Sequence, residues 1–159
     1  YNDTYHHLKG DELLKEVANV ISQNIRRERD GDWCSRFEDN GSSIGDWASR
    51  FGGDEFAIIL PGTEEKRALK VADRIRKVFS ELTFNPMGTP VRKSISLGIA
   101  HCSYSERGKK GDAAPKKGIT DYEKVATDLT NLADAALFKA KSTGKNTIEI
   151  ASKGISLAR

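Results

Sequence analysis

The sequence has 159 residues, enough for one globular domain with a core between a sheet and several helices. Hydrophobic residues make up 37% and charged residues 31%, which excludes a disordered or fibrous chain. The net charge of +3, with basic and acidic residues interleaved, gives no support for a nucleic-acid polymer as the partner.

The first half of the chain predicts one helix and one hairpin. Apolar residues recur at helical spacing from Asp11 to Arg27, which predicts an amphipathic helix. Residues 47–51 and 55–60 have strand character and are joined by a tight Gly52-Gly53 turn. Between the helix and the hairpin, residues 28–45 read as a long surface loop.

The middle of the chain predicts a helix followed by a strand. The helix extends from Thr63, as its N-cap, to about Leu82, with apolar residues at spacings of three and four. A break follows at Asn85-Pro86, and residues 91–101 then alternate as a strand. Residues 103–120 are rich in Gly, Lys, Ser and Asp and form a second long loop.

The last elements are a helix and a short strand. The helix begins at Asp121 or Asp128 and ends at Thr143, because Gly144 is a typical residue just beyond a helix. Residues 147–150 then make a final strand.

This order of elements predicts an α/β fold of the α+β sandwich kind. It fits a ferredoxin-like, palm-type architecture, with helices flanking a central antiparallel or mixed sheet, provided that a strand precedes the first helix. No such strand stands before the first helix in this sequence. We therefore expect residues 1–159 to be a single domain from a longer multidomain protein.

The cysteines and the hydropathy pattern exclude other classes. Cys34 and Cys102 lie far apart with no neighbour at metal-ligand spacing, which favours two free thiols over a zinc site or a disulfide framework. No apolar run approaches the roughly 18 residues that a membrane span needs, and residues 1–30 lack the basic and apolar regions of a signal peptide. We expect a soluble, cytoplasmic domain, which in the full protein can still be attached to a membrane receptor.

The predicted hairpin turn carries the chemistry. Gly52 and Gly53 allow a sharp turn and a close approach of the backbone to a ligand, and Asp54 and Glu55 follow directly. Adjacent carboxylates at such a tip are costly unless a cation binds them, and Mg²⁺ takes one or two carboxylates together with substrate phosphates. The same pattern also suits an ordinary solvated turn.

Residues Gly52 to Phe56 match the signature of the GGDEF family of diguanylate cyclases, and the resemblance extends along the chain. Asn2–Leu14, Ser94–Ala100 and Ala133–Asn146 resemble three further blocks of that family, in the same order. The resemblance implies an enzyme of bacterial second-messenger signalling that condenses two GTP molecules into cyclic di-GMP and releases pyrophosphate.

The resemblance also implies the catalytic and metal-binding groups. Asp54 and Glu55 would be catalytic and would bind Mg²⁺ or Mn²⁺, while Gly52 and Gly53 would let the backbone approach the substrate. In the family a further metal-binding Asp lies on the strand before the first helix, upstream of Tyr1. The 3′-hydroxyl of one GTP would attack the α-phosphorus of the other.

The remaining implied residues bind the substrate. Asn2 and Asp11 match positions that recognise guanine, and Leu14 would pack against the base; helix capping is the alternative role for the Asn and the Asp. Lys141 and Lys145, four apart at the end of a helix and therefore on one face, would hold the β- and γ-phosphates of GTP; charge complementing the helix dipole is the alternative. Lys145 replaces the usual Arg, which removes the bidentate fork.

The resemblance also implies binding partners, and the sequence departs from the family pattern at one regulatory position. One domain binds one GTP, so catalysis implies a homodimer, with an adjoining sensory or phosphodiesterase domain in the full protein. Ser43 stands where many members carry the Arg of a product-inhibition site, so we expect weak or absent feedback inhibition.

Two alternative functions stay open. One is a non-catalytic module that binds GTP or cyclic di-GMP and regulates an attached domain. The other is another nucleotidyl cyclase or a palm-type polymerase, which Asn2 and Asp11 disfavour. A purely structural role would predict no nucleotide binding.

Overall fold

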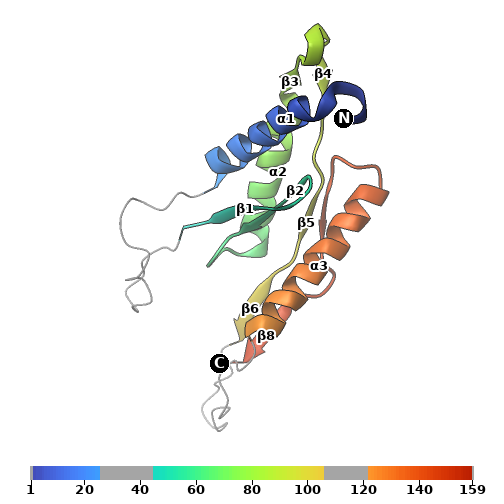
Figure 1. The fold of residues 1–159 in the computed structure, drawn as a ribbon. Helices are drawn as coiled ribbons and strands as arrows, with labels where there is room; N and C mark the ends of the chain where they lie inside the picture. Colours follow the sequence, from blue (N-terminus) through green and yellow to red (C-terminus); the bar gives the residue numbers. More distant parts are fainter. Residues whose placement is uncertain (1, 26–44, 106–121, 159) are drawn as a thin grey trace, which may run out of the picture. The chain divides into compact units, whose positions relative to one another are not determined.

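The structure is a computed structural model that describes the backbone of residues 2–25, 45–105 and 122–158, and the side chains of residues 10–25, 45–103 and 122–156 (Figure 1). The chain divides into two compact units, Tyr1–Ser94 and Ile95–Arg159, and each is described by itself. The first unit contains α1 (Asn2–Asn24), β1 (Trp47–Gly52), β2 (Glu55–Ile59), α2 (Glu65–Glu81), β3 (Thr83–Phe84), the 3-10 turn η1 (Pro86–Gly88) and β4 (Val91–Arg92). The second contains β5 (Leu97–Ile99), β6 (Cys102–Ser105), α3 (Tyr122–Ser142), β7 (Ile148–Ile150) and β8 (Ile155–Ala158).

The core of the first unit lies on α1 and α2, which contact each other. Both helices bury residues at helical spacing, so each presents one apolar stripe. Ile75 and Phe79 of α2 are the largest fully buried side chains, and the Phe79 ring lies 5.7 Å from the ring of Phe84 on β3. The buried apolar residues of the two helices are Val17, Val20, Ile21, Ala72, Ile75 and Phe79.

An arginine of α2 closes the end of α1. Arg74 donates from Nε to the side-chain oxygen of Asn24 at 2.9 Å and from a terminal nitrogen to the Asn24 carbonyl at 2.5 Å. The Asn24 amide nitrogen donates in turn to the carbonyl of Val20 at 2.8 Å. The Asn24 carbonyl, which has no donor within the helix because α1 ends there, is thereby satisfied, and Arg74 links the two helices.

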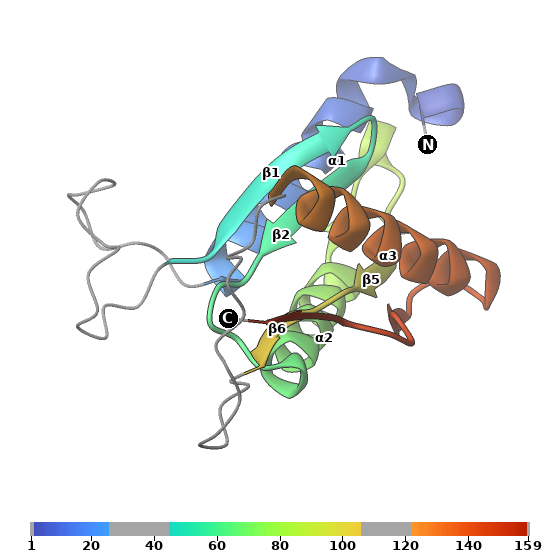
Figure 2. The same ribbon diagram turned by 90° about the horizontal axis from the view of Figure 1, so that it is seen from below.

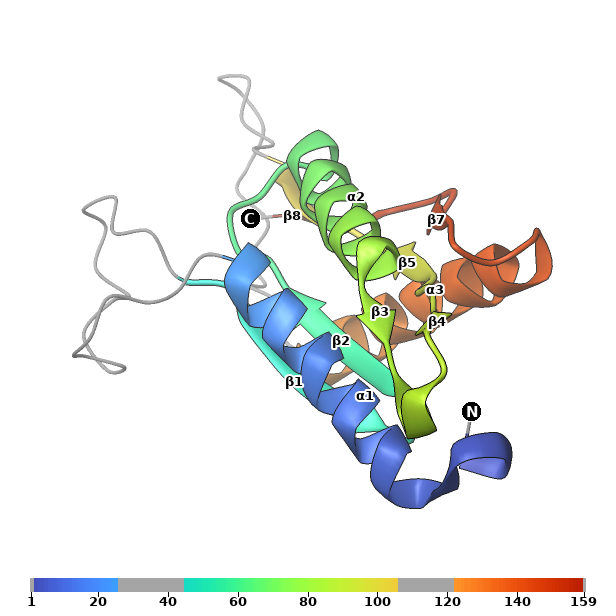
Figure 3. The ribbon, with the colours of Figure 1, turned by 90° about the horizontal axis from the view of Figure 1, so that it is seen from above.

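Two antiparallel hairpins belong to the first unit. β1 pairs with β2, and α1 lies over one face of this hairpin (Figures 2 and 3). β3 pairs with β4 through η1, where Met87 has a positive φ of 55° and a side chain that is 73% exposed. Met87 is the one methionine of the sequence.

The second unit places one helix against short parallel strands. β5 pairs with β7, and β6 with β8, both in parallel. α3 contacts β5 and β7, and its buried residues are the small Ala136 and Ala140, which is completely buried. Lys139 of α3 forms an ion pair of 2.7 Å with Glu149 of β7, which ties the end of the helix to the sheet.

The helices and the mixture of antiparallel and parallel pairs confirm the expected α+β fold class. The predicted strands at 47–51, 55–60 and 147–150 are confirmed as β1, β2 and β7. The last helix begins at Tyr122, which agrees with the earlier of the two predicted starts. Among the described residues, no helix is long and apolar enough to cross a bilayer.

The first helix is longer than its apolar pattern predicts. α1 begins at Asn2 instead of Asp11 and continues through Gly10. Capping is therefore wrong as the alternative role for Asp11, which lies well inside the helix. The early turns were missed because their residues lack an apolar stripe and contain a glycine, a weak helix former.

Two other boundaries differ from the prediction. The N-cap of α2 is Glu64 instead of the predicted Thr63, whose hydroxyl donates to the carbonyl of Pro61. Residues 91–101 form no single strand: β4 and β5 lie within them, and each pairs with a different partner strand. The predicted loops 28–45 and 103–120 lie almost wholly outside the described residues, although β6 already occupies Cys102–Ser105.

Candidate functional site

The tip of the β1–β2 hairpin carries the two predicted metal-binding carboxylates. The strands pair from Trp47 opposite Ile59 to Gly52 opposite Glu55, with a register shift between Arg50 and Gly52. Gly52 therefore belongs to β1, and the turn itself is Gly53-Asp54 instead of the predicted Gly52-Gly53. Gly53 has a φ of 51°, a left-handed conformation that glycine adopts without strain.

Arg50 holds this turn from the strand below it. Its side chain donates two hydrogen bonds to the carbonyl oxygen of Gly53, from Nε at 3.0 Å and from a terminal nitrogen at 2.6 Å. The Asp54 side chain is exposed, whereas Glu55 is half-buried at the start of β2. Asp54 thus lies in a turn that Arg50 holds by two hydrogen bonds and faces solvent, and Glu55 follows directly on β2.

A groove of about 640 Å³ lies between α1 and the same hairpin, and it includes two of the predicted guanine-binding residues. Asp11 and Leu14 stand on the α1 side, and Arg50 and Phe56 on the hairpin side. The volume falls within the roughly 300–1,000 Å³ typical of small-molecule sites. The lining residues are Asp11, Leu14, Lys15, Ala18, Ile21, Ser22, Ala48, Ser49, Arg50 and Phe56.

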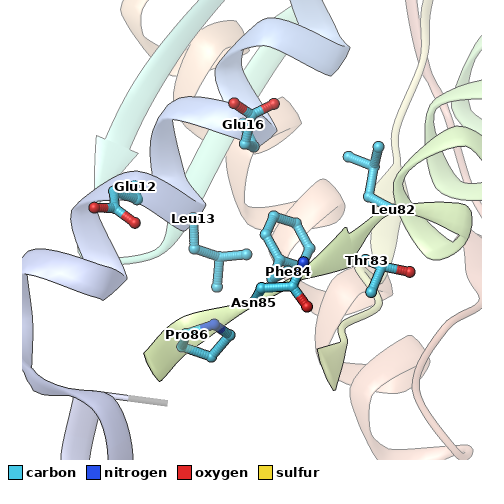
Figure 4. Close-up of a pocket in the computed structure, with 8 residues that line it drawn as sticks. All are labelled: Glu12, Leu13, Glu16, Leu82, Thr83, Phe84, Asn85 and Pro86. Carbon is cyan, nitrogen blue, oxygen red and sulfur yellow. The ribbon is translucent and has the colours of Figure 1, made fainter. Parts of the chain in front are cut away.

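A second groove, of about 460 Å³, lies between α1 and the β3 region. Figure 4 shows Glu12 and Glu16 on the helix and Phe84 and Pro86 opposite them. Two carboxylates on one wall repel the phosphates of a nucleotide, whereas Lys15 and Arg50 in the larger groove attract them. The larger groove is therefore the better candidate for a nucleotide. The residues that line the smaller one are Glu12, Leu13, Glu16, Leu82, Thr83, Phe84, Asn85 and Pro86.

The two predicted phosphate-binding lysines lie at the end of α3, in the second unit. Lys141 is in the last helical turn. Lys145 is not on the helix, so the prediction that both share a helical face is wrong. The chain turns at Gly144 with a φ of 118°, Lys145 and Asn146 follow with φ values of 59° and 48°, and the Lys145 amide donates to the Ala140 carbonyl at 3.1 Å.

This turn places Lys145 in an uncommon backbone conformation. A non-glycine residue in the left-handed region costs about 1–2 kcal/mol, and two such residues stand in succession here. Such strain is concentrated at functional sites in many proteins. The turn therefore gives Lys145 a fixed position just beyond the helix.

The chemistry of the hairpin acids suits a divalent cation with oxygen ligands. Asp54 and Glu55 are adjacent carboxylates, and Mg²⁺ typically takes one or two of these while keeping several waters. Within residues 2–25, 45–105 and 122–158 there is no group of three or more His, Cys, Asp or Glu residues that could hold a metal. The described residues thus fit an open site that phosphates and water complete, and do not fit a closed protein cage.

The structure brings some predicted residues together and leaves others apart. Asp11 and Leu14 share one groove with the stem of the hairpin that carries Asp54 and Glu55. Asn2 is the first residue of α1, but its side chain lies outside the described part of the chain, as does Ser43. Lys141 and Lys145 belong to the other unit.

Two residues with clear structural roles at this site were not singled out from the sequence. Arg50 fixes the hairpin turn, and Phe56 lines the groove. The position of each next to the Gly52–Glu55 segment was a signal that both face the same site. The hydrogen bonds from Arg50 to a backbone carbonyl cannot be inferred from residue types.

Comparisons with known proteins point to one family. The family model described as "Diguanylate cyclase, GGDEF domain" matches residues 1–117. Diguanylate cyclase A of Treponema denticola is 29% identical over 154 residues, which cover 97% of this chain and 32% of that protein. Diguanylate cyclase DosC of Escherichia coli K12 is 31% identical over 150 residues, covering 94% of this chain and 25% of that protein.

Solved structures give the same result at the level of the fold. The diguanylate cyclase SiaD of Pseudomonas aeruginosa, in complex with its activator SiaC, has a TM-score of 0.65 and 25% identity, covering 94% of this chain and 44% of that one. The active GGEEF domain of a Vibrio cholerae diguanylate cyclase has a TM-score of 0.61 and 25% identity, covering 96% and 75%. The GGDEF domain of DgcB from Caulobacter crescentus, in complex with c-di-GMP, has a TM-score of 0.64 and 22% identity, covering 96% and 70%.

The fold and these neighbours define an α+β domain of the nucleotidyl-cyclase fold class. Since the family model covers well over half of the sequence, the chain belongs to the GGDEF family. It spans about a third and a quarter of the two curated relatives named above.

Proposed function

We propose that this domain is a diguanylate cyclase, which joins two GTP molecules into cyclic di-GMP with release of two pyrophosphates. The observation that carries the proposal is the groove in which Asp11 and Leu14 lie beside the stem of the Asp54-Glu55 hairpin. One groove thereby offers a carboxylate acceptor for the donor edge of guanine and an apolar surface for its face. The acids for the reacting phosphates follow on the same hairpin.

The residues of this chain would divide the work between binding and chemistry. Asp11 and Leu14, with Asn2, would bind the base, and Lys141 and Lys145 would bind the β- and γ-phosphates through charge-assisted hydrogen bonds. Asp54 and Glu55 would hold Mg²⁺ or Mn²⁺, which would neutralise charge on the phosphates. Asp54 would also help to remove the proton from the attacking 3′-hydroxyl.

Two copies of the domain are required for the product. Each phosphodiester bond joins the 3′-hydroxyl of one GTP to the α-phosphorus of the other, and each domain offers one set of guanine-binding residues. Two domains that face each other would therefore form both bonds. The rate per mole of protein should then rise with protein concentration, until the dimer is saturated.

The test is an assay of the full-length purified protein with GTP and Mg²⁺, with products separated by chromatography. Asp54→Asn removes the charge at constant shape and should lower cyclic di-GMP formation by on the order of 100-fold or more. Asp128→Asn makes the same change at an exposed carboxylate of α3 and should leave the rate unchanged.

The alternative is a module that binds GTP or cyclic di-GMP and regulates an attached domain. Such a module could keep the groove beside Asp11 and Leu14 and bind a nucleotide there without turning it over. GTP binding without product, at a protein concentration that gives dimers, would establish this alternative. A protein that binds neither nucleotide would overturn both proposals.

A further inference from the structure

In the second unit, α3 rests directly on the backbone of β5 at Gly98. A methyl carbon built on Gly98 would overlap the carbonyl oxygen of Ala133 and the amide nitrogen of Leu137, and would lie 2.9 Å from the Leu137 Cα. All three atoms belong to the helix backbone. No side-chain rotation can relieve such an overlap, so any larger residue must push the helix away from the strand.

The strand cannot move away instead without loss of its own pairing. β5 is hydrogen-bonded to β7 on both sides of Gly98: the Leu97 amide donates to the Thr147 carbonyl at 3.0 Å, and the Ala151 amide donates to the Ile99 carbonyl at 2.8 Å. The adjustment would therefore fall on the helix. Carbon atoms pack at about 3.5–4.0 Å, so a shift of roughly 1 Å is needed for the Leu137 Cα alone.

The buried residues of α3 are small, which allows the helix to lie close to the strand. These residues are Ala136 and Ala140, which are 6% and 0% exposed. Lys141 follows Ala140 directly, and the Lys145 amide is bonded to the Ala140 carbonyl at 3.1 Å. A shift of this part of the helix is thus passed to both lysines.

The geometry points to Gly98 as a positioning residue for phosphate binding: it sets the depth at which α3 lies on β5, and thereby the position of Lys141 and Lys145. This inference rests on the proposed function, because it takes the two lysines as the groups that hold the GTP phosphates. Errors of about 1 Å in positioning can cost as much as 100-fold in rate, because charged hydrogen bonds depend steeply on geometry.

A second glycine of the same unit provides a matched control. A methyl carbon built on Gly154 would also overlap a neighbour, but that neighbour is the imidazole ring of His101, with the Cδ2 atom at 2.8 Å. A ring at the end of a rotatable side chain can move, and α3 is not involved. Gly154→Ala therefore makes the same chemical change, with a steric conflict that leaves the helix in place.

The experiment compares binding of GTP and of guanosine, which lacks phosphates, to the full-length protein by NMR titration and calorimetry. Gly98→Ala should weaken GTP binding by about 10-fold and leave guanosine binding unchanged, while Gly154→Ala changes neither. In a Lys141→Ala background, Gly98→Ala should weaken GTP binding by much less than 10-fold, because two substitutions that act through one contact are not additive.

Each outcome decides the inference. Equal loss of GTP and guanosine binding, or full additivity with Lys141→Ala, would reduce Gly98 to a residue needed for folding. If Gly98→Ala does not fold, Ala140→Val, which enlarges a completely buried residue of the same helix, should give the same selective loss; unchanged GTP affinity in that variant would overturn the inference. Wild-type protein that binds neither ligand would instead defeat the proposed function.

Discussion

The two units bury their helices in different ways. In the first unit, α1 and α2 meet through large side chains, with Ile75 and Phe79 each 1% exposed. In the second, the backbone of α3 lies against the strand backbone at Gly98, and the buried residues of the helix are the small Ala136 and Ala140. Truncation of a large buried side chain leaves a cavity that its neighbours fill only in part, whereas an atom added where helix backbone lies on strand backbone meets no side chain that can move aside. The first unit should therefore be sensitive to lost volume, and the second to added volume.

The largest expected effect is the loss of a ring from the first unit. Phe79→Ala removes a fully buried side chain that also contacts Phe84, and should lower the free energy of unfolding by about 3–5 kcal/mol. Guanidinium denaturation followed by circular dichroism measures the loss. Hydrogen exchange should show faster opening of α2 than of α3; uniform acceleration in both would mean that the two units unfold together.

The second effect tests the reverse sensitivity. Ala140→Val adds two carbon atoms at a completely buried position of α3 and should cost about 1–3 kcal/mol by overpacking. The same substitution at Ala126, which is exposed on the outer face of α3, controls for the lower helix propensity of valine. Equal losses of unfolding free energy at the two positions would contradict close packing around Ala140.

A smaller effect is expected for the contact that closes α1. Arg74→Met keeps much of the aliphatic stem but removes both hydrogen bonds to Asn24, which should cost about 1 kcal/mol. Arg67→Met, at an exposed arginine of the same helix, serves as the control in thermal denaturation. No difference in Tm between the two variants would show that Arg74 contributes nothing to the packing of α1 on α2.

The smallest effect concerns surface charge in the first unit. Hydrogen bonds from Lys77 and then Arg76, both at 2.8 Å, hold the pKa of Asp73 below its ordinary value. The charged pairs thus stabilise the fold above the ordinary pKa of an aspartate, and this contribution is lost as pH falls through the lowered pKa. Asp73→Asn should therefore lower Tm slightly at pH 7 and less at pH 2.5, with a smaller difference in high salt because Asp73 is exposed. A Tm gap that does not change with pH would contradict this reading.

Periodicity predicted the elements whose apolar stripes are buried, and failed where no stripe exists. The spacing of Ala72, Ile75 and Phe79 was enough to place α2, and those residues form its buried face. The early turns of α1 were missed because residues 2–10 carry no apolar stripe in the sequence. The segment 91–101 alternates throughout, but which strand each part pairs with depends on the tertiary fold.

In the candidate site, too, the sequence predicted some features and the backbone geometry determines the others. Residue types and the family resemblance predicted Asp54 and Glu55 as metal ligands, because adjacent carboxylates after glycines suit a bound Mg²⁺, and that role stays a prediction. The groove between α1 and the hairpin, the turn at Gly53-Asp54 and the left-handed conformation of Lys145 follow from backbone geometry. The role of Gly98 was also invisible, since a glycine in a strand has several explanations until the helix above it is seen.

The position of Met87 has a practical consequence for experiments on this domain. As the one methionine of the sequence, at the exposed turn between β3 and β4, it offers a single methyl group for isotope labelling. Its methyl signal would then report on the hairpin next to the smaller groove. The same thioether should be oxidised readily by peroxide, and the added polarity would fall on the surface instead of in the core.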